Sequence, residues 1–200
     1  MKKYFRKITA LILVLALAVC ISACGGQKKE IEETVLNLIA ALKSGDMEEA
    51  GKFIDSGGLT FSGIDSLDGG DQVIDSVFKA LDCEIVSSEK KGSNEAAVNA
   101  KITTLDLTAV LGQSTMKVLQ EFAMGEIEEE DIDRRTEEIF KEAISGKDLE
   151  TAATEVVILV KKSESGWRVV VDKDFQNAIS GGFLGAVNKA QSALFKTEGE

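Results

Sequence analysis

Few side chains in this 200-residue chain could perform catalysis or hold a metal. The sequence contains no histidine, and its only tyrosine, Tyr4, lies near the amino-terminus. Histidine is the commonest general base in enzymes and a usual neutral metal ligand. Serine–histidine–aspartate triads, cysteine–histidine pairs and histidine-bound metals are therefore excluded. We expect no catalytic residues, no metal and no cofactor.

One short pattern could support acyl transfer. Residues 114–117 read Ser-Thr-Met-Lys, which matches the Ser-x-x-Lys pattern of penicillin-binding proteins and β-lactamases. In a helix, Ser114 and Lys117 would lie on adjacent turns of one face. The partner motifs Ser-Asp-Asn and Lys-Thr-Gly are missing, and the same spacing recurs at residues 88–91. We interpret the pattern as an ordinary turn of helix.

Two groups of acidic residues offer oxygen ligands. Asp65, Asp68 and Asp71 lie in a glycine-rich segment, and closely spaced oxygen ligands suit Ca²⁺. The residue order of an EF-hand is not met, so we interpret this group as a turn, with a calcium site as the alternative. Residues 126–133 hold six carboxylates. We expect them to form the solvated start of a helix, with a partner-binding or cation-attracting patch as the alternative.

Three single residues are further candidates. Asp106 follows an alternating strand and is expected to cap the next helix. Trp167 begins a hairpin strand and is expected in the core, with a ligand platform as the alternative. Cys83 occupies an apolar position of a strand, where we expect a buried, inert thiol, with a reactive thiol as the alternative.

The amino-terminal segment is the most informative part of the sequence. Four basic residues precede an apolar run over residues 8–19, and the segment ends in Ile-Ser-Ala-Cys at residues 21–24. This is the order of a signal peptide, and residues 8–23 fall short of the about 20 apolar residues that span a bilayer. Cys24 after small residues resembles the lipobox of bacterial lipoproteins. Cys20 follows the larger Val19 and fits less well; an ordinary secretory signal is the alternative.

The lipobox resemblance implies removal of residues 1–23 and a diacylglyceryl group on Cys24. Two acyl chains, such as palmitate, form a stable anchor, whereas one chain binds marginally. We therefore expect a cell-envelope protein anchored by lipid to the extracytoplasmic face of the cell membrane. Residues 24–29 would form a short tether.

Charge further limits the function classes. Residues 1–23 carry four basic and no acidic residues, so their removal leaves 19 basic and 34 acidic residues, a net charge of −15. Such a chain is repelled by nucleic acid and by anionic lipid head groups. We expect no nucleic-acid partner.

Hydrophobic periodicity predicts helices and antiparallel strands, an α+β order. Serine and glycine at 44–45 are expected to end the first helix, and Asp46 to cap the second with Glu49 in a capping-box pattern. Six helices are predicted: a first helix, a short second helix, a helix over 71–81, a long helix after Asp106, a helix through 132–144 and a helix over 183–195. The apolar stripe of the first helix consists of Ile31, Val35, Leu38, Ile39 and Leu42. The stripe of the long helix consists of Leu107, Val110, Leu111, Val118, Leu119 and Phe122. The predicted strands cover residues 81–88, 96–104, 156–160 and 167–171, with 156–160 as a fully buried run.

Residues 38–50, 102–106 and 165–169 make the mature region similar to small lipoproteins of unknown function with a nuclear-transport-factor-2-like domain. This resemblance implies a cystatin-like cone over residues 30–182, in which amino-terminal helices pack on a curved antiparallel sheet. Residues 107–150 depart from the pattern as a helical insertion between strand pairs, and residues 183–200 form a carboxy-terminal helix and tail.

Because the sequence lacks a catalytic signature, the leading prediction is a function without catalysis. The cone of this fold often holds a small ligand, so we expect binding of a small molecule or of an envelope protein, with Trp167 and Asp106 as candidate cavity residues. A carboxylate enzyme, with Asp106 as general base in the cone, and a structural envelope spacer are the alternatives.

Overall fold

The computed structural model describes residues 26–61, 64, 70–146 and 149–186. The predicted signal peptide, Cys24, Asp65 and Asp68 lie outside these residues. The described helices are a first helix over residues 26–44, α2 (Met47–Gly51), α3 (Gly70–Lys79), α4 (Leu107–Ala123), a 3₁₀ turn η1 (Glu129–Asp131), α5 (Ile132–Ile144), α6 (Lys173–Ile179) and a helical turn at 183–186. The strands are β1 (Asp82–Lys90), β2 (Glu95–Leu105), β3 (Thr151–Ser163) and β4 (Gly166–Val169).

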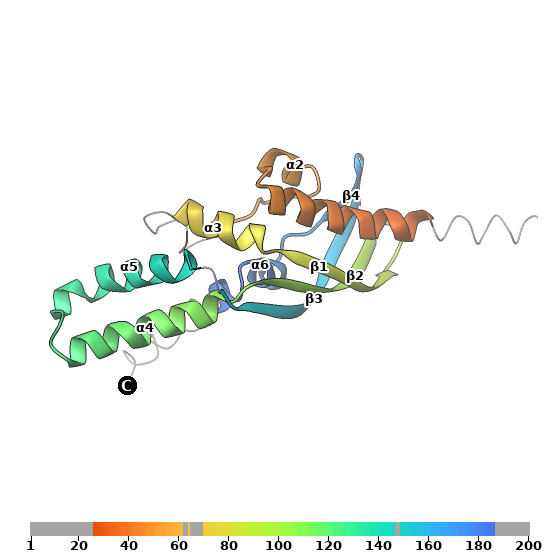
Figure 1. Cartoon of the computed structure of the whole chain (residues 1–200). Helices are drawn as coiled ribbons and strands as arrows, with labels where there is room; N and C mark the ends of the chain where they lie inside the picture. Colours follow the sequence, from red (N-terminus) through yellow and green to blue (C-terminus); the bar gives the residue numbers. More distant parts are fainter. Residues whose placement is uncertain (1–25, 62–63, 65–69, 147–148, 187–200) are drawn as a thin grey trace, which may run out of the picture.

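The four strands form one curved antiparallel sheet in the order β1-β2-β3-β4 (Figure 1). A register shift between Ile85 and Ser87 breaks the regular pairing of β1 with β2. Because α4 and α5 lie between β2 and β3, the predicted helical insertion is confirmed, as is the α+β class.

Helices cover one face of the sheet. Alternate residues of β2 and β3 are buried on this face, among them Ile102 and Ile158, whose exposed surface is nil. The first helix reaches β1, where the Ser88 hydroxyl donates to Glu32. Helix α3 reaches β2, where the Thr104 hydroxyl donates to the Val77 carbonyl at 3.0 Å.

The amino-terminal helices end and begin where the sequence predicts. All five residues of the predicted stripe are buried, and Gly45 ends the first helix with a φ of 74°, a conformation that favours glycine. The Asp46 side chain caps α2 by accepting from the Glu49 N–H at 2.9 Å. The Glu49 carboxylate pairs with Lys52 and does not return to the Asp46 N–H, which donates to the Ala41 carbonyl, so only half of the capping box forms.

Three features differ from the sequence-based predictions. Residues 26–29, predicted as part of a tether, are helical. Val157 and Leu159 are exposed, so the 156–160 run is buried on one side only, because the described helices cover a single face of the sheet. Helix α6 was not predicted, although Asp172 caps it by accepting from the Phe175 N–H at 2.8 Å.

Candidate functional site

Asp106 and Trp167 do not lie together in the structure. The sheet register pairs Leu105 with Thr151 at one end of β3 and Trp167 with Lys162 near its other end. Eleven residue steps along β3 separate these positions, about 36 Å at 3.3 Å per residue. The two residues therefore belong to opposite ends of the sheet and do not line one cavity.

Each of these two residues has a structural role. The Asp106 carboxylate caps α4 by accepting from the Ala109 N–H at 2.8 Å. Trp167 is buried in the core, and the Lys162 ammonium lies 5.9 Å from the centroid of its ring. The cap predicted for Asp106 and the core position predicted for Trp167 are thus what the structure shows.

Cys83 is half-buried in β1. Burial raises the pKa of its thiol to about 11, and the neighbouring Asp82 carboxylate adds to this shift. The thiolate is the nucleophilic form of cysteine, so a raised pKa keeps this residue unreactive at neutral pH.

The Ser-x-x-Lys pattern lies on α4, but its two functional residues do not pair. Ser114 is buried, and its hydroxyl has no hydrogen-bond partner among the described residues. Lys117 is exposed. Acyl transfer by serine requires a base in hydrogen-bond contact with the hydroxyl. This contact is absent from the described structure, which favours the interpretation as a turn of helix.

The insertion forms a helical hairpin, the arm, made of α4, η1 and α5. The arm extends away from the sheet, with its connecting turn at the far end (Figure 1). Gly125, with a φ of 71°, follows α4 in this turn. Buried apolar side chains of α4 and α5 lie in the part of the arm nearer the sheet, up to Val118 on α4 and from Ile139 on α5. These are Leu107, Val110 and Val118 on α4 and Ile139, Phe140 and Ile144 on α5.

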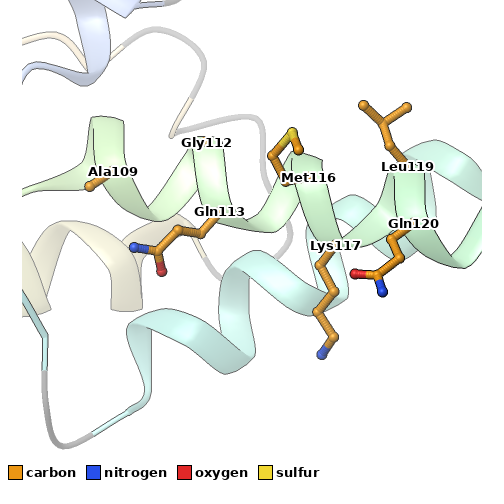
Figure 2. A pocket seen from close by; sticks show the side chains of 7 residues that line it. All are labelled: Ala109, Gly112, Gln113, Met116, Lys117, Leu119 and Gln120. Atoms are coloured by element: carbon orange, nitrogen blue, oxygen red, sulfur yellow. The ribbon is translucent and has the colours of Figure 1, made fainter.

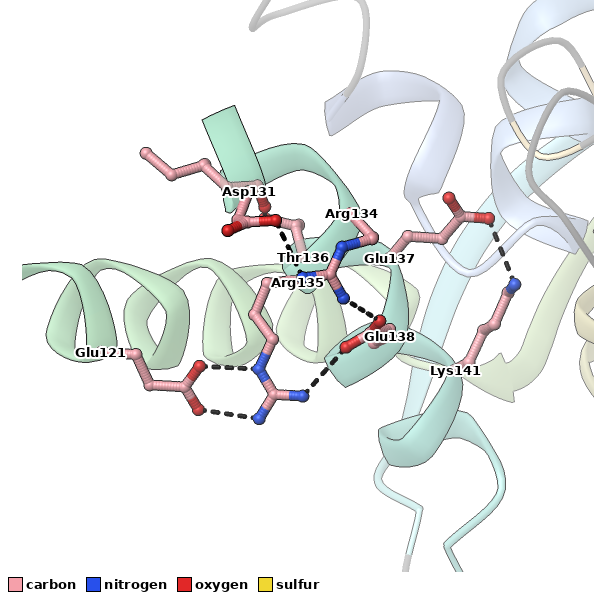
Figure 3. Close-up of polar contacts among 9 residues, drawn as sticks. Glu121, Asp131, Arg134, Arg135, Thr136, Glu137, Glu138 and Lys141 are labelled. Atoms are coloured by element: carbon pink, nitrogen blue, oxygen red, sulfur yellow. Dashed lines mark hydrogen bonds and ion pairs between the residues drawn. The ribbon is translucent and has the colours of Figure 1, made fainter. Parts of the chain in front are cut away.

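An ion-pair network joins the two helices of the arm. The Arg135 guanidinium donates to both carboxylate oxygens of Glu121, at 2.7 and 3.0 Å, and to Glu138 at 3.2 Å (Figure 3). Arg134 pairs with Glu138 and, at 2.9 Å, with Asp131. The hydrogen bonds from Arg135 hold the pKa of Glu121 below its usual value, and those from Arg135 and Arg134 do the same for Glu138. Of the acidic block at 126–133, Asp131 therefore has a local structural role.

The outer side of α4 corrects one sequence-based prediction. Leu119 and Phe122 were predicted to belong to the packed stripe, but their side chains are 50% and 42% exposed. The packed face runs instead through Leu107, Val110, Ser114 and Val118, because α5 lies on that side. Figure 2 shows Met116 and Leu119 on the side of α4 opposite α5.

Two pockets adjoin α4. The larger, of about 850 Å³, is lined among the described residues by α4 alone, including Gly112, Met116 and Leu119. The smaller, of about 310 Å³, lies between α4 and α5 and includes Ser114 and Glu142 in its lining. Neither pocket is lined by Asp106 or Trp167. The sequence-based candidates on the arm are the acidic block at 126–133, with a partner-binding patch as its alternative, and Ser114 and Lys117, which line the smaller pocket. The exposed apolar side of α4 was not predicted, although the number of apolar residues on more than one side of this helix could have indicated it.

The described ranges show neither a metal-binding cluster nor a membrane-spanning helix. These residues contain no group of three or more cysteine, aspartate or glutamate side chains arranged to hold a metal ion. No helix in the same part of the chain has the length and apolar character needed to cross a bilayer.

Comparison with known proteins gives structural likenesses at low sequence identity. No family model matches the chain, and no curated protein matches it. A crystal structure described as that of a putative lipoprotein, ycdA, from Bacillus subtilis subsp. subtilis str. 168 is similar at 16% sequence identity with a TM-score of 0.38. The match covers 70% of this chain and 42% of that chain. A likeness at this TM-score supports no conclusion about function.

Proposed function

We propose that this protein is a non-catalytic binding protein, anchored by lipid at Cys24 to the extracytoplasmic face of the cell membrane, that contacts an envelope protein through the tip of its arm. The anchor is supported by the basic, apolar and small-residue segments that precede Cys24. The first helix begins by residue 26, so the folded body would lie close to the acyl chains.

The exposed apolar tip of the arm is the observation that carries the proposed binding role. Phe122 and Met124 are 42% and 57% exposed at the end of α4. Exposed aromatic and methionine side chains are enriched where proteins bind one another, and methionine adapts its shape to a partner. The acidic residues Glu128, Glu129 and Glu130 follow and are exposed. The tip therefore suits a partner whose apolar patch is bordered by basic side chains.

The residues that were candidates for catalysis lack the contacts or the ionisation state that catalysis needs, which favours a binding role. The Asp106 carboxylate is engaged as a helix cap, Ser114 has no basic partner among the described residues, and the raised pKa of Cys83 suppresses its thiolate. A catalytic carboxylate needs a pKa matched to its task, usually through burial in a cleft. The caps and ion pairs seen for the arm carboxylates instead stabilise the fold.

We also infer that the body of the protein is related to the nuclear-transport-factor-2-like domain. This is supported by amino-terminal helices that pack on one face of a curved antiparallel sheet, and by the insertion at the position where the sequence departs from the family pattern. The tightly packed residues on the inner face, such as Ile102, Ile158 and Val169, favour a structural role for this body. Binding would then rest on the arm.

Site-specific photo-cross-linking in intact cells tests the binding role. The full chain would carry p-benzoylphenylalanine in place of Phe122 or, as a control of similar exposure on α2, in place of Met47. We expect a discrete cross-linked species at position 122 only. Combining this probe with Glu128→Gln, Glu129→Gln and Glu130→Gln should reduce the yield severalfold, because the acidic border guides association. Equal cross-linking at both positions, or none at position 122, would refute the proposal.

A further inference from the structure

The space between α4 and α5 contains a buried hydroxyl without a partner. Ser114 is 1% exposed, and its Oγ makes no hydrogen bond to any described residue. A serine or threonine in a helix can donate to the carbonyl four residues earlier, as Thr115 does to Leu111 at 2.9 Å. Buried polar atoms are rarely left unpaired, because an unmade hydrogen bond destabilises the fold. The Ser114 hydroxyl is therefore available to a bound molecule.

Ser114 lines the pocket of about 310 Å³ between the two helices, which we call the hairpin pocket. Its described lining combines apolar, polar and charged side chains: Gln113, Ser114 and Lys117 on α4 and Ile139, Glu142 and Ala143 on α5. Ser114 and Ile139 are buried at its floor, whereas Gln113, Lys117 and Glu142 are exposed at its rim. Figure 2 shows the side chains of Gln113 and Lys117 directed from α4 toward α5.

The pairing of the two helices leaves the charged groups of the hairpin pocket without ion pairs. In the antiparallel arm, Arg135 on α5 lies opposite Glu121 on α4 (Figure 3). Lys117 comes four residues before Glu121 and Ile139 four residues after Arg135, so Lys117 lies level with an apolar residue. Neither Lys117 nor Glu142 has an ion pair among the described contacts. The pocket thus offers one ammonium and one carboxylate to a ligand.

We propose that the hairpin pocket binds a small zwitterion of the α-amino-acid class. The carboxylate of the ligand would bind the Lys117 ammonium and accept a hydrogen bond from the Ser114 hydroxyl, and its ammonium group would bind the Glu142 carboxylate. The Gln113 amide would supply a further hydrogen bond, and the Ile139 side chain would contact the apolar part of the ligand. Gln113 and Lys117 are long side chains at the rim, so their movement gives the ligand access to the buried hydroxyl.

Charge favours a zwitterion over a ligand with a single charge. Residues 121–150 contain 12 acidic and four basic residues, so the surrounding arm repels an anion. A cation that approaches Glu142 is repelled by Lys117. A molecule that carries both charges and no net charge engages both groups without either repulsion. The pocket volume of about 310 Å³ lies at the small end of ligand sites, about 300–1,000 Å³, which suits a ligand of few atoms. Binding here is independent of the contact proposed for the tip.

Equilibrium dialysis of the full chain, solubilised in detergent, tests the site. The probes are an equimolar mixture of the common L-α-amino acids, together with acetate and methylamine, which each carry only one of the two charges. We expect mass spectrometry to find one or a few amino acids retained by the protein. Acetate and methylamine should bind at least about tenfold more weakly, because each lacks one charge-assisted contact. Retention of no amino acid, or of acetate or methylamine as strongly as any amino acid, would overturn the proposal.

Substitutions in the hairpin pocket separate binding from folding. Lys117→Gln and Glu142→Gln should each weaken retention about tenfold, because each removes one charged contact. Ser114→Ala should weaken retention severalfold without lowering the free energy of unfolding, measured by urea denaturation, because it removes an unpaired buried hydroxyl. Lys43→Gln, on the first helix, changes the net charge as Lys117→Gln does and should leave retention unchanged. Retention that the three pocket variants leave intact, or an equal loss in Lys43→Gln and Lys117→Gln, would place binding elsewhere and overturn the proposal.

Discussion

Gly181 follows α6, at the point where the chain passes beside the start of α4. Its φ is 63°, and a Cβ atom there would overlap the Leu105 carbonyl oxygen. Gly45 has a similar φ of 74°, but a Cβ atom there meets no atom within 4 Å. A substitution at Gly45 therefore tests the cost of the backbone conformation alone, whereas one at Gly181 adds the cost of a steric overlap.

We predict that Gly181→Ala lowers the free energy of unfolding far more than Gly45→Ala. Alanine in the left-handed region costs about 1–2 kcal/mol, and the overlap at Gly181 should bring the loss to about 3 kcal/mol or more. Urea denaturation followed by circular dichroism measures both changes. Similar losses for the two variants would show that the crossing tolerates a side chain.

Cys83 provides a second prediction at the scale of one residue. Because the pKa of its thiol is raised to about 11, little thiolate is present near pH 8. Alkylation by iodoacetamide in the folded protein should be roughly a hundredfold slower than in concentrated urea, where the thiol regains its ordinary pKa. Mass spectrometry of the Cys83 peptide over time gives both rates. Equal rates would mean that the thiol is accessible and reactive in the native protein.

At the scale of the element, β3 separates a covered from an open face. Ile158 is buried under the helices, whereas its neighbour Leu159 points to the other side and is 42% exposed. We predict that Ile158→Ala lowers the free energy of unfolding by about 2–5 kcal/mol and Leu159→Ala by less than about 1 kcal/mol. Denaturant titration of the two variants measures this difference. A large loss for Leu159→Ala would show that a further part of the molecule covers the outer face.

The arm gives a pH-dependent prediction. Arg135 lowers the pKa of Glu121, and Arg135 and Arg134 lower that of Glu138, so both carboxylates bind protons less readily in the folded arm than in the unfolded chain. Their contribution to arm stability is present above the unfolded pKa, about 4.3, and is lost as the pH falls through the lower folded values. Hydrogen exchange in α4 and α5 should therefore accelerate, relative to the sheet, as the pH is lowered toward 3.

A charge-neutralising variant checks the cause of this effect. Glu121→Gln removes the carboxylate that accepts two hydrogen bonds from Arg135, and it should raise hydrogen exchange in the arm severalfold at neutral pH. Glu142→Gln on α5 changes the net charge equally, and Glu142 has no ion pair with Arg135 among the described contacts. If both variants raise hydrogen exchange equally, the stability of the arm depends on net charge and not on the Glu121–Arg135 pair.

Local signals made the helix ends predictable from the sequence. A cap such as Asp46 or Asp106 accepts a hydrogen bond from a backbone N–H three residues away. Gly45 adopts the left-handed backbone conformation that ends the first helix and that other residues adopt only with strain. The same kind of signal was present for α6 in Asp172 followed by the apolar Phe175, but the short helix escaped notice. These features depend on a few neighbouring residues and need no tertiary information.

The positions that could not be predicted depend on partners far away in sequence. The apolar residues of α4 occupy more than one side, and only the placement of α5 decides that Val118 is packed and Leu119 is open. The exposure of Val157 likewise follows from the absence of a described helix on that face of the sheet. The separation of Asp106 from Trp167 is a consequence of strand register, which periodicity alone does not reveal.

At the scale of the whole molecule, the proposed anchor and the negative charge act in opposite directions. Without residues 1–23 the chain carries a net charge of −15, so anionic head groups repel the body while the acyl chains on Cys24 would hold it. The arm extends from the sheet (Figure 1). Repulsion by the head groups would direct its acidic residues away from the lipid surface. Such an orientation would leave the tip accessible to another envelope protein.

We predict that Cys24→Ser abolishes the lipid-modified amino-terminal peptide, whereas Cys20→Ser leaves it unchanged, because only Cys24 follows two small residues. Mass spectrometry of that peptide from membrane fractions is the required measurement, since an uncleaved leader could retain the Cys24→Ser chain at the membrane. Detergent-phase partitioning gives a second reading. A diacylated product in the Cys24→Ser chain, or a mature wild-type chain without acyl groups, would contradict the anchor, and the location proposed for the arm would then have no support.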